Sequence, residues 1–119
     1  MNIEDLRAYC LAKPGTTEGT PFGEDVLVFK VVGKMFALTS LASVDLRVNL
    51  KCDPALAIEL REQYPSVLPG YHMSKKNWNT VIIDGSVPDK QIREWIDDSY
   101  KLVVAGLSKK LREQLNSES

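Results

Sequence analysis

The sequence predicts an α+β fold in which helices pack on one face of a single antiparallel sheet of about five strands. The first observation behind this prediction is the order of the segments, which reads helix, three strands, helix, one or two strands, helix. The second is that no repeat, interdomain linker or low-complexity run divides the chain of 119 residues. We therefore expect one domain over residues 1–119, with its core at about residues 2–107 and a C-terminal tail at 108–119.

Short β-branched and apolar segments in the first half of the chain predict the first strands. Residues 26–32 are apolar on both faces, which is typical of a strand that is covered on two sides. Gly33-Lys34 supplies a two-residue turn into a second strand at 35–41, so these two strands are expected to form a hairpin. The preceding residues, 16–20, are polar and rich in threonine, and we interpret them as a linker.

Alternation of apolar and polar residues predicts a third strand at residues 46–52. One face of this strand is expected to lie on the core, and it carries Leu46, Val48, Leu50 and Cys52. The other face is polar and partly basic, is expected to point outward, and carries Arg47, Asn49 and Lys51. Residues 78–83 predict a further strand that Asp84-Gly85 ends, and the short segment 67–69 is a candidate for one more.

Helices are predicted from cap residues and from apolar positions at helical spacing. Asn2 caps the first helix, which ends at Pro14-Gly15. Asp53-Pro54 opens the second, whose inward face carries Leu56, Ala57, Leu60 and Tyr64. Pro88 opens the longest, whose buried stripe is Ile92, Trp95, Ile96, Ser99, Val103 and Leu107. The segment 108–115 in the tail is expected to add a short helix.

Charge and composition restrict the classes of function. The chain has 16 acidic and 15 basic residues and a net charge of −1, so any affinity for nucleic acid must come from a local basic face. Glu4 and Asp5 stand where a secretory signal needs positive charge, and no window approaches the roughly 18 apolar residues of a membrane-spanning helix. We expect a cytoplasmic protein that does not associate with membranes.

The residues that usually carry catalysis are scarce. His72 is the one histidine of the sequence, and it would meet a nucleophile only through the tertiary fold. Cys10 and Cys52 are far apart in sequence, and structural zinc needs about four ligands, which argues against a metal site. We interpret both cysteines as small buried hydrophobes, with a disulfide or a redox role as the alternative. Phosphate-binding glycine motifs do not occur, so we expect neither catalysis nor a cofactor.

The stretch from Pro69 to Trp78 concentrates more chemistry than any other part of the sequence. It combines the histidine, a lysine pair and two aromatic residues behind a Pro-Gly turn. In one interpretation the lysines contact the phosphates of a nucleic acid, an aromatic residue lies against a base or sugar, and the outward row of the third strand extends the basic face. The candidate nucleic-acid-binding residues are then Arg47, Lys51, Tyr71, His72, Lys75, Lys76 and Trp78.

The same residues also have a purely structural interpretation. Trp78 then anchors the core at the start of a strand, Met73 fills a gap in the packing, and His72 bonds the backbone of a turn. Lys75 and Lys76 are simply solvated, as are the outward residues of the third strand. Composition and spacing leave both interpretations open.

Several motifs, taken in order, resemble the MmcQ/YjbR family. They are Cys10-Leu11-Ala12-Lys13-Pro14-Gly15, Val48-Asn49-Leu50-Lys51-Cys52, the run from Pro69 to Val81, Asp84-Gly85, Val87-Pro88 and Ser99-Tyr100-Lys101-Leu102-Val103. The resemblance extends from about residue 2 to about residue 107. The order and spacing of these motifs, rather than any one of them, make it specific.

The resemblance implies a small cytosolic bacterial protein whose fold is similar to the secretion-chaperone-like and frataxin-like sandwiches. It also implies a predicted DNA-binding role through a double-wing motif, without a known cofactor or catalytic activity. The wing tips would be the turn at Gly33-Lys34 and the loop that leads to Lys75-Lys76. The alternative is a protein-interaction or adaptor module with no nucleic-acid role, which would use a face or an exposed edge of the sheet.

Overall fold

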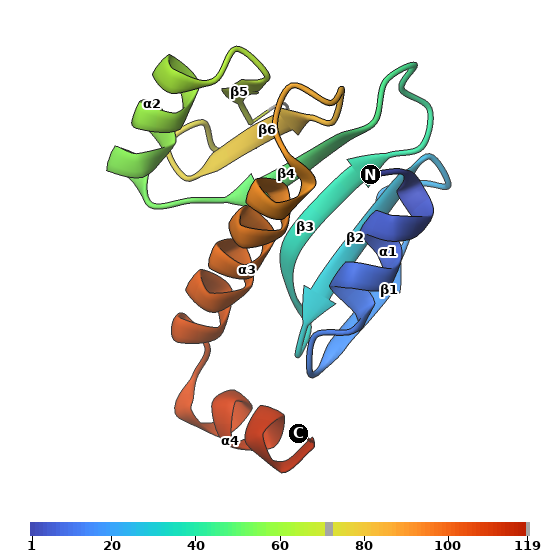
Figure 1. The fold of residues 1–119 in the computed structure, drawn as a ribbon. Helices are drawn as coiled ribbons and strands as arrows, with labels where there is room; N and C mark the ends of the chain where they lie inside the picture. Colours follow the sequence, from blue (N-terminus) through green and yellow to red (C-terminus); the bar gives the residue numbers. More distant parts are fainter. Residues whose placement is uncertain (71–72, 119) are drawn as a thin grey trace.

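In this computed structural model, residues 1–70 and 73–118 are described, and they form one antiparallel sheet with a layer of helices (Figure 1). The elements are α1 (Ile3–Leu11), β1 (Thr16–Gly19), β2 (Val26–Val31), β3 (Lys34–Ser40), β4 (Arg47–Lys51), α2 (Pro54–Gln63), β5 (Val67–Pro69), β6 (Trp78–Ile82), α3 (Asp89–Ala105) and α4 (Lys109–Glu118). Their strands lie in the order β1-β2-β3-β4-β6-β5, and every neighbouring pair is antiparallel. The α+β prediction is confirmed, with a sheet of six strands in the described residues.

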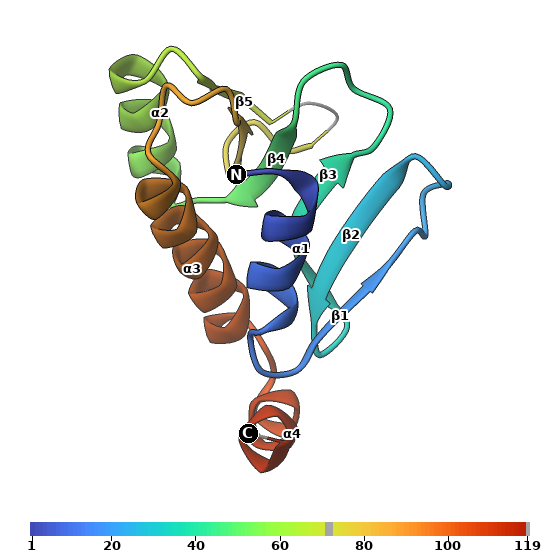
Figure 2. The same ribbon diagram turned by 45° about the vertical axis from the view of Figure 1, so that its right-hand side comes forward.

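The helices α1, α2 and α3 cover the same face of the sheet, as the two ribbon views show (Figure 1 and Figure 2). α3 lies along β3 and β4, α1 lies against β1, and α2 covers β5 and β6. The core lies between these layers, and its fully buried side chains include Leu6, Phe29, Phe36, Ile92 and Ile96. Leu115 of α4 also packs against this core. In the part of the chain that is described, no helix is long and apolar enough to cross a membrane.

Both predicted cap residues begin their helices. The Asn2 side chain accepts a hydrogen bond from the Asp5 backbone at 2.8 Å, and the Asp5 carboxylate accepts one from the Asn2 backbone at 3.2 Å. This reciprocal pair is a capping box. Asp53 accepts a hydrogen bond from the Leu56 backbone at 3.4 Å, and Pro54 occupies the first turn of α2.

The predicted buried faces of the helices are confirmed with one exception. Every residue of the stripe that begins in α3 is buried. In α2, Ala57 and Leu60 are buried and Tyr64 packs against the core, but Leu56 is exposed. Leu56 lies roughly 100° around the helix from Ala57, which places it at the margin of the buried face.

The threonine-rich residues that the sequence indicated as a linker instead form β1, at the edge of the sheet. Residues 16–19 pair with residues 28–31 of β2 along their whole length. Three of these four residues are exposed, so no apolar alternation reveals the strand in the sequence. Backbone hydrogen bonds to β2 define it, and Arg7 of α1 donates to the Glu18 carboxylate at 2.8 Å from the covered side.

The β2–β3 hairpin turns one residue earlier than the sequence indicated. Val31 pairs with Lys34, so the central turn residues are Val32 and Gly33. Their φ angles are both positive, 47° and 82°, as a type I′ turn requires. Glycine adopts this conformation readily, but a β-branched valine does so only under strain. Tertiary contacts offset the strain, because Val32 packs partly against the core and its N–H donates to the Gly15 carbonyl at 3.1 Å.

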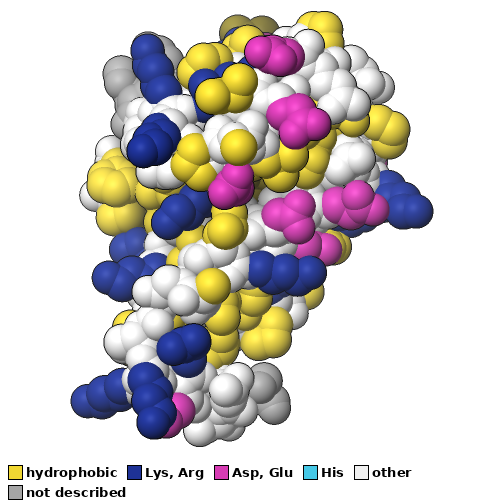
Figure 3. All heavy atoms as spheres, turned by 90° about the vertical axis from the view of Figure 1, so that its left-hand side faces the viewer, with side chains coloured by type: hydrophobic (Ala, Val, Ile, Leu, Met, Phe, Trp, Pro, Cys, Tyr) yellow, Lys and Arg dark blue, Asp and Glu magenta, His cyan; other side chains and the backbone are white. Residues whose placement is uncertain are grey.

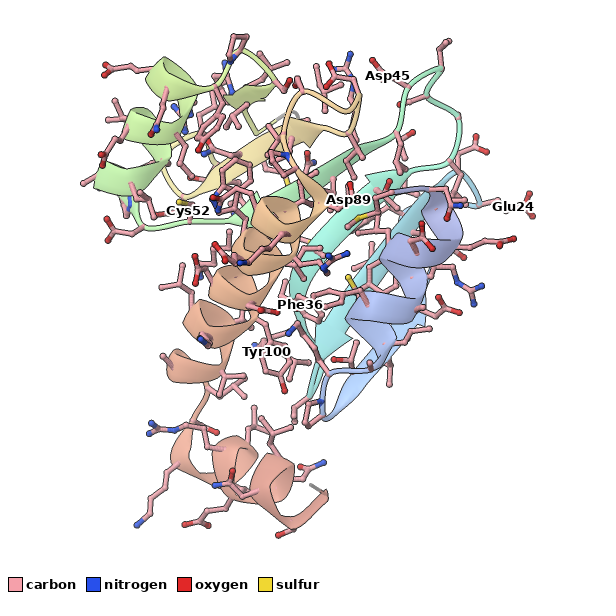
Figure 4. The ribbon with its side chains drawn as sticks, in the orientation of Figure 1. Glu24, Phe36, Asp45, Cys52, Asp89 and Tyr100 are labelled. Carbon is pink, nitrogen blue, oxygen red and sulfur yellow. The ribbon has the colours of Figure 1, made fainter. Side chains whose placement is uncertain are left out.

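A β-bulge in β3 places two adjacent side chains on the covered face. The register with β2 shifts between Phe29 and Lys30, and Phe36 has no partner residue in β2. Phe36 and Ala37 are consequently both fully buried, although neighbouring residues of a regular strand point to opposite faces. The Phe36 ring packs edge-on against Tyr100 of α3, with 5.3 Å between the ring centroids (Figure 4).

Next to the bulge, β3 and β4 separate, and a serine of α3 bridges the gap. The last residues paired on this side are Ala37 and Leu50. The Ser99 hydroxyl donates to the Phe36 carbonyl at 2.6 Å and accepts a hydrogen bond from the Lys51 N–H at 2.9 Å. Ser99 is fully buried, so it supplies the partner that two interior backbone groups would otherwise lack.

A second contact ties α1 to α3. Lys13, just after α1, forms an ion pair with Asp97, whose carboxylate also accepts a hydrogen bond from the Tyr9 hydroxyl at 2.7 Å. The Lys13 ammonium lies 5.0 Å from the centroid of the Tyr9 ring and 5.2 Å from that of Tyr100. Burial opposes the ionisation of Asp97, but the hydrogen bonds from Lys13 and Tyr9 outweigh it and hold the pKa of Asp97 below its usual value. Burial, together with the hydrogen bond to Asp97, raises the pKa of Tyr9 to about 12.

We expect Ser99→Ala to lower the free energy of unfolding by about 3 kcal/mol, because two buried backbone groups lose their partner at roughly 1–3 kcal/mol each. Chemical denaturation followed by circular dichroism measures this loss. Ser43→Ala, at an exposed serine of the β3–β4 loop, is the control and should change stability by less than about 0.5 kcal/mol. Equal effects of the two substitutions would contradict the bridging role of Ser99.

Stability should also depend on Asp97 at acid pH. Because the pKa of Asp97 is lower in the folded than in the unfolded chain, its interactions stabilise the fold above the unfolded pKa of about 3.9, and this contribution is lost as pH falls through the folded pKa. The difference in unfolding free energy between wild type and Asp97→Asn should be largest near neutral pH and should shrink below about pH 4. Urea titrations over this range measure it, with Asp98→Asn at the exposed neighbour as the matched control. A difference that stays constant toward acid pH would contradict the assignment.

Candidate nucleic-acid interface

The candidate loop connects β5 to β6, and backbone hydrogen bonds fix both of its ends. The Gly70 N–H donates to the Trp78 carbonyl at 2.9 Å, which closes the hairpin. The N–H groups of Asn77 and Trp78 both donate to the Ser74 carbonyl, at 3.2 and 3.0 Å. The N–H of Cys52, just after β4, donates to the Asn77 carbonyl at 2.7 Å. The described part of the loop is therefore held against the end of β4.

Gly70 allows the two ends of the loop to approach closely. It is buried, and a Cβ atom at this position would lie 2.8 Å from the Trp78 Cβ and 2.9 Å from the Trp78 carbonyl oxygen. Trp78 is half-buried at the start of β6, and Pro69 pairs with Asn79 across the β5–β6 ladder. Pro69, Gly70 and Trp78 therefore shape the loop, but Trp78 is not among the described residues that form the core or pack against it, so the prediction that it anchors the core is not confirmed.

Arg61, which the sequence did not single out, braces the loop from α2. Its Nε donates to the Asn79 Oδ1 at 2.6 Å, and its Nη2 donates to the Lys75 carbonyl. The Asn79 side chain is buried and donates in turn to the Ala57 carbonyl at 3.3 Å. The guanidinium of Arg61 thus binds the loop from within the protein. Its place in the last turn of a helix favours a cation there, but that signal names no partner.

Lys75 and Lys76 extend from this braced loop into solvent. Both are exposed, and their side chains form no ion pair within residues 1–70 and 73–118. Lys51 lies next to them, because it pairs with Trp78 across β4 and β6 and points to the uncovered face of the sheet. It too forms no ion pair with a described residue. We call Lys51, Lys75 and Lys76 the basic corner.

Charge is unevenly distributed over this side of the molecule. In Figure 3, Lys and Arg side chains gather along the left edge and in the lower part of the view, whereas Asp and Glu side chains lie mainly toward the top and the right. On the face drawn in Figure 3, a net charge of −1 for the chain thus coexists with a local excess of basic side chains. A local basic face is what a nucleic-acid ligand requires of a nearly neutral protein.

Two residues of the predicted outward row do not belong to the basic corner. Arg47 stands at the opposite end of β4, and its Nε and Nη2 donate to Asp45 at 2.7 and 3.2 Å. These hydrogen bonds lower the pKa of Asp45, and the pair compensates the charge of Arg47. Asn49 is buried rather than exposed, because side chains of both neighbouring strands flank it and its Oδ1 accepts a hydrogen bond from the Thr80 hydroxyl at 2.6 Å.

The candidate set is thus divided. Lys51, Lys75 and Lys76 are brought together with Trp78, and Arg47 is placed elsewhere. The predicted candidates Tyr71 and His72 lie outside the described residues. The other proposed wing tip is the β2–β3 turn, and β3 separates β2 from β4, the strand that carries Lys51.

Both cysteines are free thiols, and burial disfavours the thiolate form of each. Cys10 is fully buried, and burial raises its pKa to about 12. Cys52 is half-buried, and burial raises its pKa as well. The thiolate is the reactive form of cysteine, so these pKa shifts lower the reactive fraction of both thiols. In the described residues, no group of three or more His, Cys, Asp or Glu side chains could hold a metal ion.

The protein is a small α+β domain, in which one layer of helices covers an antiparallel sheet. A loop with exposed lysines lies at the end of the central strands. The chain belongs to the YjbR family, whose family model matches residues 11–102. It is 37% identical to the protein YjbR of Escherichia coli (strain K12) over 115 residues, which are 97% of this chain and 98% of that protein. It is 42% identical to YbdF of Escherichia coli O157:H7 over 90 residues, which are 76% of this chain and 74% of that protein.

A solved structure supports the same assignment. The crystal structure of the Deinococcus radiodurans protein DR2400 superposes with a TM-score of 0.89 at 42% sequence identity, over 97% of this chain and 88% of that one. A Pseudomonas syringae protein superposes with a TM-score of 0.75 at 29% identity, over 86% of this chain and 98% of that one. These comparisons confirm the resemblance that the motifs indicated, and they assign no ligand.

We expect Gly70→Ala to lower the free energy of unfolding by about 1–3 kcal/mol, because the added methyl group forces the Trp78 backbone to move. Thermal or chemical denaturation measures the change. Gly19→Ala in β1 is the matched control, because a Cβ atom there meets nothing within 4 Å. If both variants unfold alike, the close approach of Gly70 and Trp78 is not a constraint on the fold.

Proposed function

We propose that this protein binds DNA, and that the basic corner contacts the phosphates. The observation that carries the proposal is the lysine pair Lys75 and Lys76, which is exposed and not paired with any described acidic side chain. When unpaired lysines contact the phosphates of DNA, counterions condensed on the DNA are released, and this release favours binding. Lys51 adds a third cation from the end of β4.

The brace from Arg61 supports this proposal. Its hydrogen bond to the Lys75 carbonyl fixes the backbone from which the lysine pair extends. A loop that is held in place loses less conformational entropy when it binds than a free loop does. The charges are thus presented at a fixed place beside the uncovered face of the sheet.

The expected mode of binding is weak and largely independent of sequence. Phosphate contacts position a protein on DNA but do not read the bases. Three cations on a chain of net charge −1 also make affinity strongly dependent on salt. Trp78 is half-buried, and its exposed part can add contact with a sugar or base. We further propose that the function is binding without catalysis and that it takes place in the cytoplasm.

The double variant Lys75→Gln, Lys76→Gln should bind duplex DNA more weakly than wild type. The slope of log affinity against log salt should become less steep by about 2, since each lost phosphate contact removes about 0.9. Fluorescence anisotropy of a labelled duplex, titrated at several salt concentrations, measures both quantities.

Lys109→Gln, Lys110→Gln is the matched control, because it removes the same charge from an exposed pair on α4. This control should retain most of the affinity and the salt slope of wild type. Three results would contradict the proposal: no binding of duplex by wild type, binding that is insensitive to salt, or equal losses in the two double variants.

A further inference from the structure

Large apolar side chains are exposed at the end of the sheet opposite the basic corner. Two loops project there, residues 20–25 between β1 and β2 and residues 41–46 between β3 and β4. Phe22 in the first loop is 66% exposed, and in the second Leu41 is 48% exposed and Val44 is fully exposed. The loops adjoin, because the Leu41 N–H donates to the Asp25 carbonyl at 2.6 Å.

A groove lies beside Leu41 and Val44, between the start of α1 and the β3–β4 loop. Its volume is about 390 Å³, and its apolar lining comes from Met1, Ile3, Leu41, Val44 and Leu46. A volume in this range accommodates one or two large side chains of a binding partner. Isolated exposed apolar residues are ordinary on a protein surface, but several of them around one groove indicate an interaction site.

Carboxylates surround this apolar surface. Glu24 and Asp25 stand next to Phe22 and are exposed, Asp45 lies beside Val44, and Asp84 lies in the loop after β6. Figure 4 shows Glu24, Asp45 and Asp89 toward the same end of the molecule, away from α4. Arg47 is paired with Asp45 and the amino group of Met1 with Asp89, so Glu24, Asp25 and Asp84 are the carboxylates of this set that form no ion pair with a described residue. We call this region, with its two loops, the acidic end.

The sign of the charge decides which ligand this surface can take. Nucleic acids and anionic membranes are repelled by a cluster of carboxylates. A neutral apolar ligand would fill the groove but would make no favourable contact with the exposed carboxylates of Glu24 and Asp25. A polypeptide segment that carries both an apolar side chain and cations matches the groove and its rim together.

We propose that the acidic end docks a segment of another protein that presents an apolar side chain flanked by Lys or Arg. The apolar side chain enters the groove between α1 and the β3–β4 loop and packs against Val44 and Leu41. Its flanking cations face Glu24 and Asp25 on the neighbouring loop. This site is separate from the basic corner, and it does not depend on the nucleic-acid proposal.

Selection from a display library of random short peptides on the immobilised full chain tests the site. The enriched peptides should combine a large apolar residue with neighbouring Lys or Arg, and affinity for a synthesised member should fall with salt. Phe22→Ser, Val44→Ser should weaken binding of that peptide by about tenfold or more, as removal of central interface contacts does. Both side chains are exposed, so the variant should unfold at the same denaturant concentration as wild type.

Two further variants separate the contributions. Glu24→Gln, Asp25→Asn should lower the affinity and flatten its salt dependence, because the carboxylates that face the cations are neutralised. Ile58→Ser, at an apolar residue of α2 that is 56% exposed, is the matched control and should bind the peptide like wild type.

Three outcomes would overturn the proposal. The first is a selection without basic-apolar enrichment. The second is peptide binding that Phe22→Ser, Val44→Ser leaves unchanged while Ile58→Ser weakens it. The third is a molar mass in solution that rises with concentration and becomes monomeric in Phe22→Ser, Val44→Ser, because the surface then belongs to a contact between copies of this chain.

Discussion

The hydroxyl of Ser99 holds the point at which the sheet opens. The bulge at Phe36 turns two adjacent side chains of β3 into the core, and the pairing of β3 with β4 ends next to it, at Ala37 and Leu50. The serine, carried by α3, bonds to both groups and is fully buried. The bridge anchors α3 to β3 and β4 beside the place where the Phe36 ring packs against Tyr100. Because Lys51 is one of its two partners, the same interaction fixes the end of β4 at which the basic corner forms.

The sheet separates the charges of the protein along its central strands. β4 begins at Arg47, beside the acidic end, and ends at Lys51, in the basic corner. At one end the cation is paired with Asp45, so the carboxylates of the neighbouring loops dominate. At the other, Arg61 donates to the loop backbone, so the lysine side chains remain available. A net charge of −1 is thus compatible with two surfaces of opposite sign, each of which suits a different class of partner.

Sequence patterns predicted the candidate site only in part. The sequence predicts that Lys75 and Lys76 lie on a loop between two strands, because turn residues surround them. Lys51 belongs to the same corner because the strand register pairs it with Trp78. Strand alternation places Arg47 on the same face as Lys51. It does not reveal that Asp45, two residues earlier, accepts a hydrogen bond from the Arg47 side chain. Arg61 and Asn79 brace the loop through a contact between a helix and a strand, and no local pattern encodes such a contact.

The sequence alone determined the helices, most strands and the covered face. Caps at Asn2 and Asp53 and the stripe that begins at Ile92 are local features, because a helix repeats every 3.6 residues and its ends need side-chain partners. Tertiary structure decided the rest. β1 is a strand only because β2 offers it hydrogen-bond partners, and Val32 adopts a positive φ only because the hairpin and its contact with Gly15 offset the strain. The bulge at Phe36, the bridge through Ser99 and the separation of charge likewise arise from groups distant in sequence, whose energies exist only once the chain has folded.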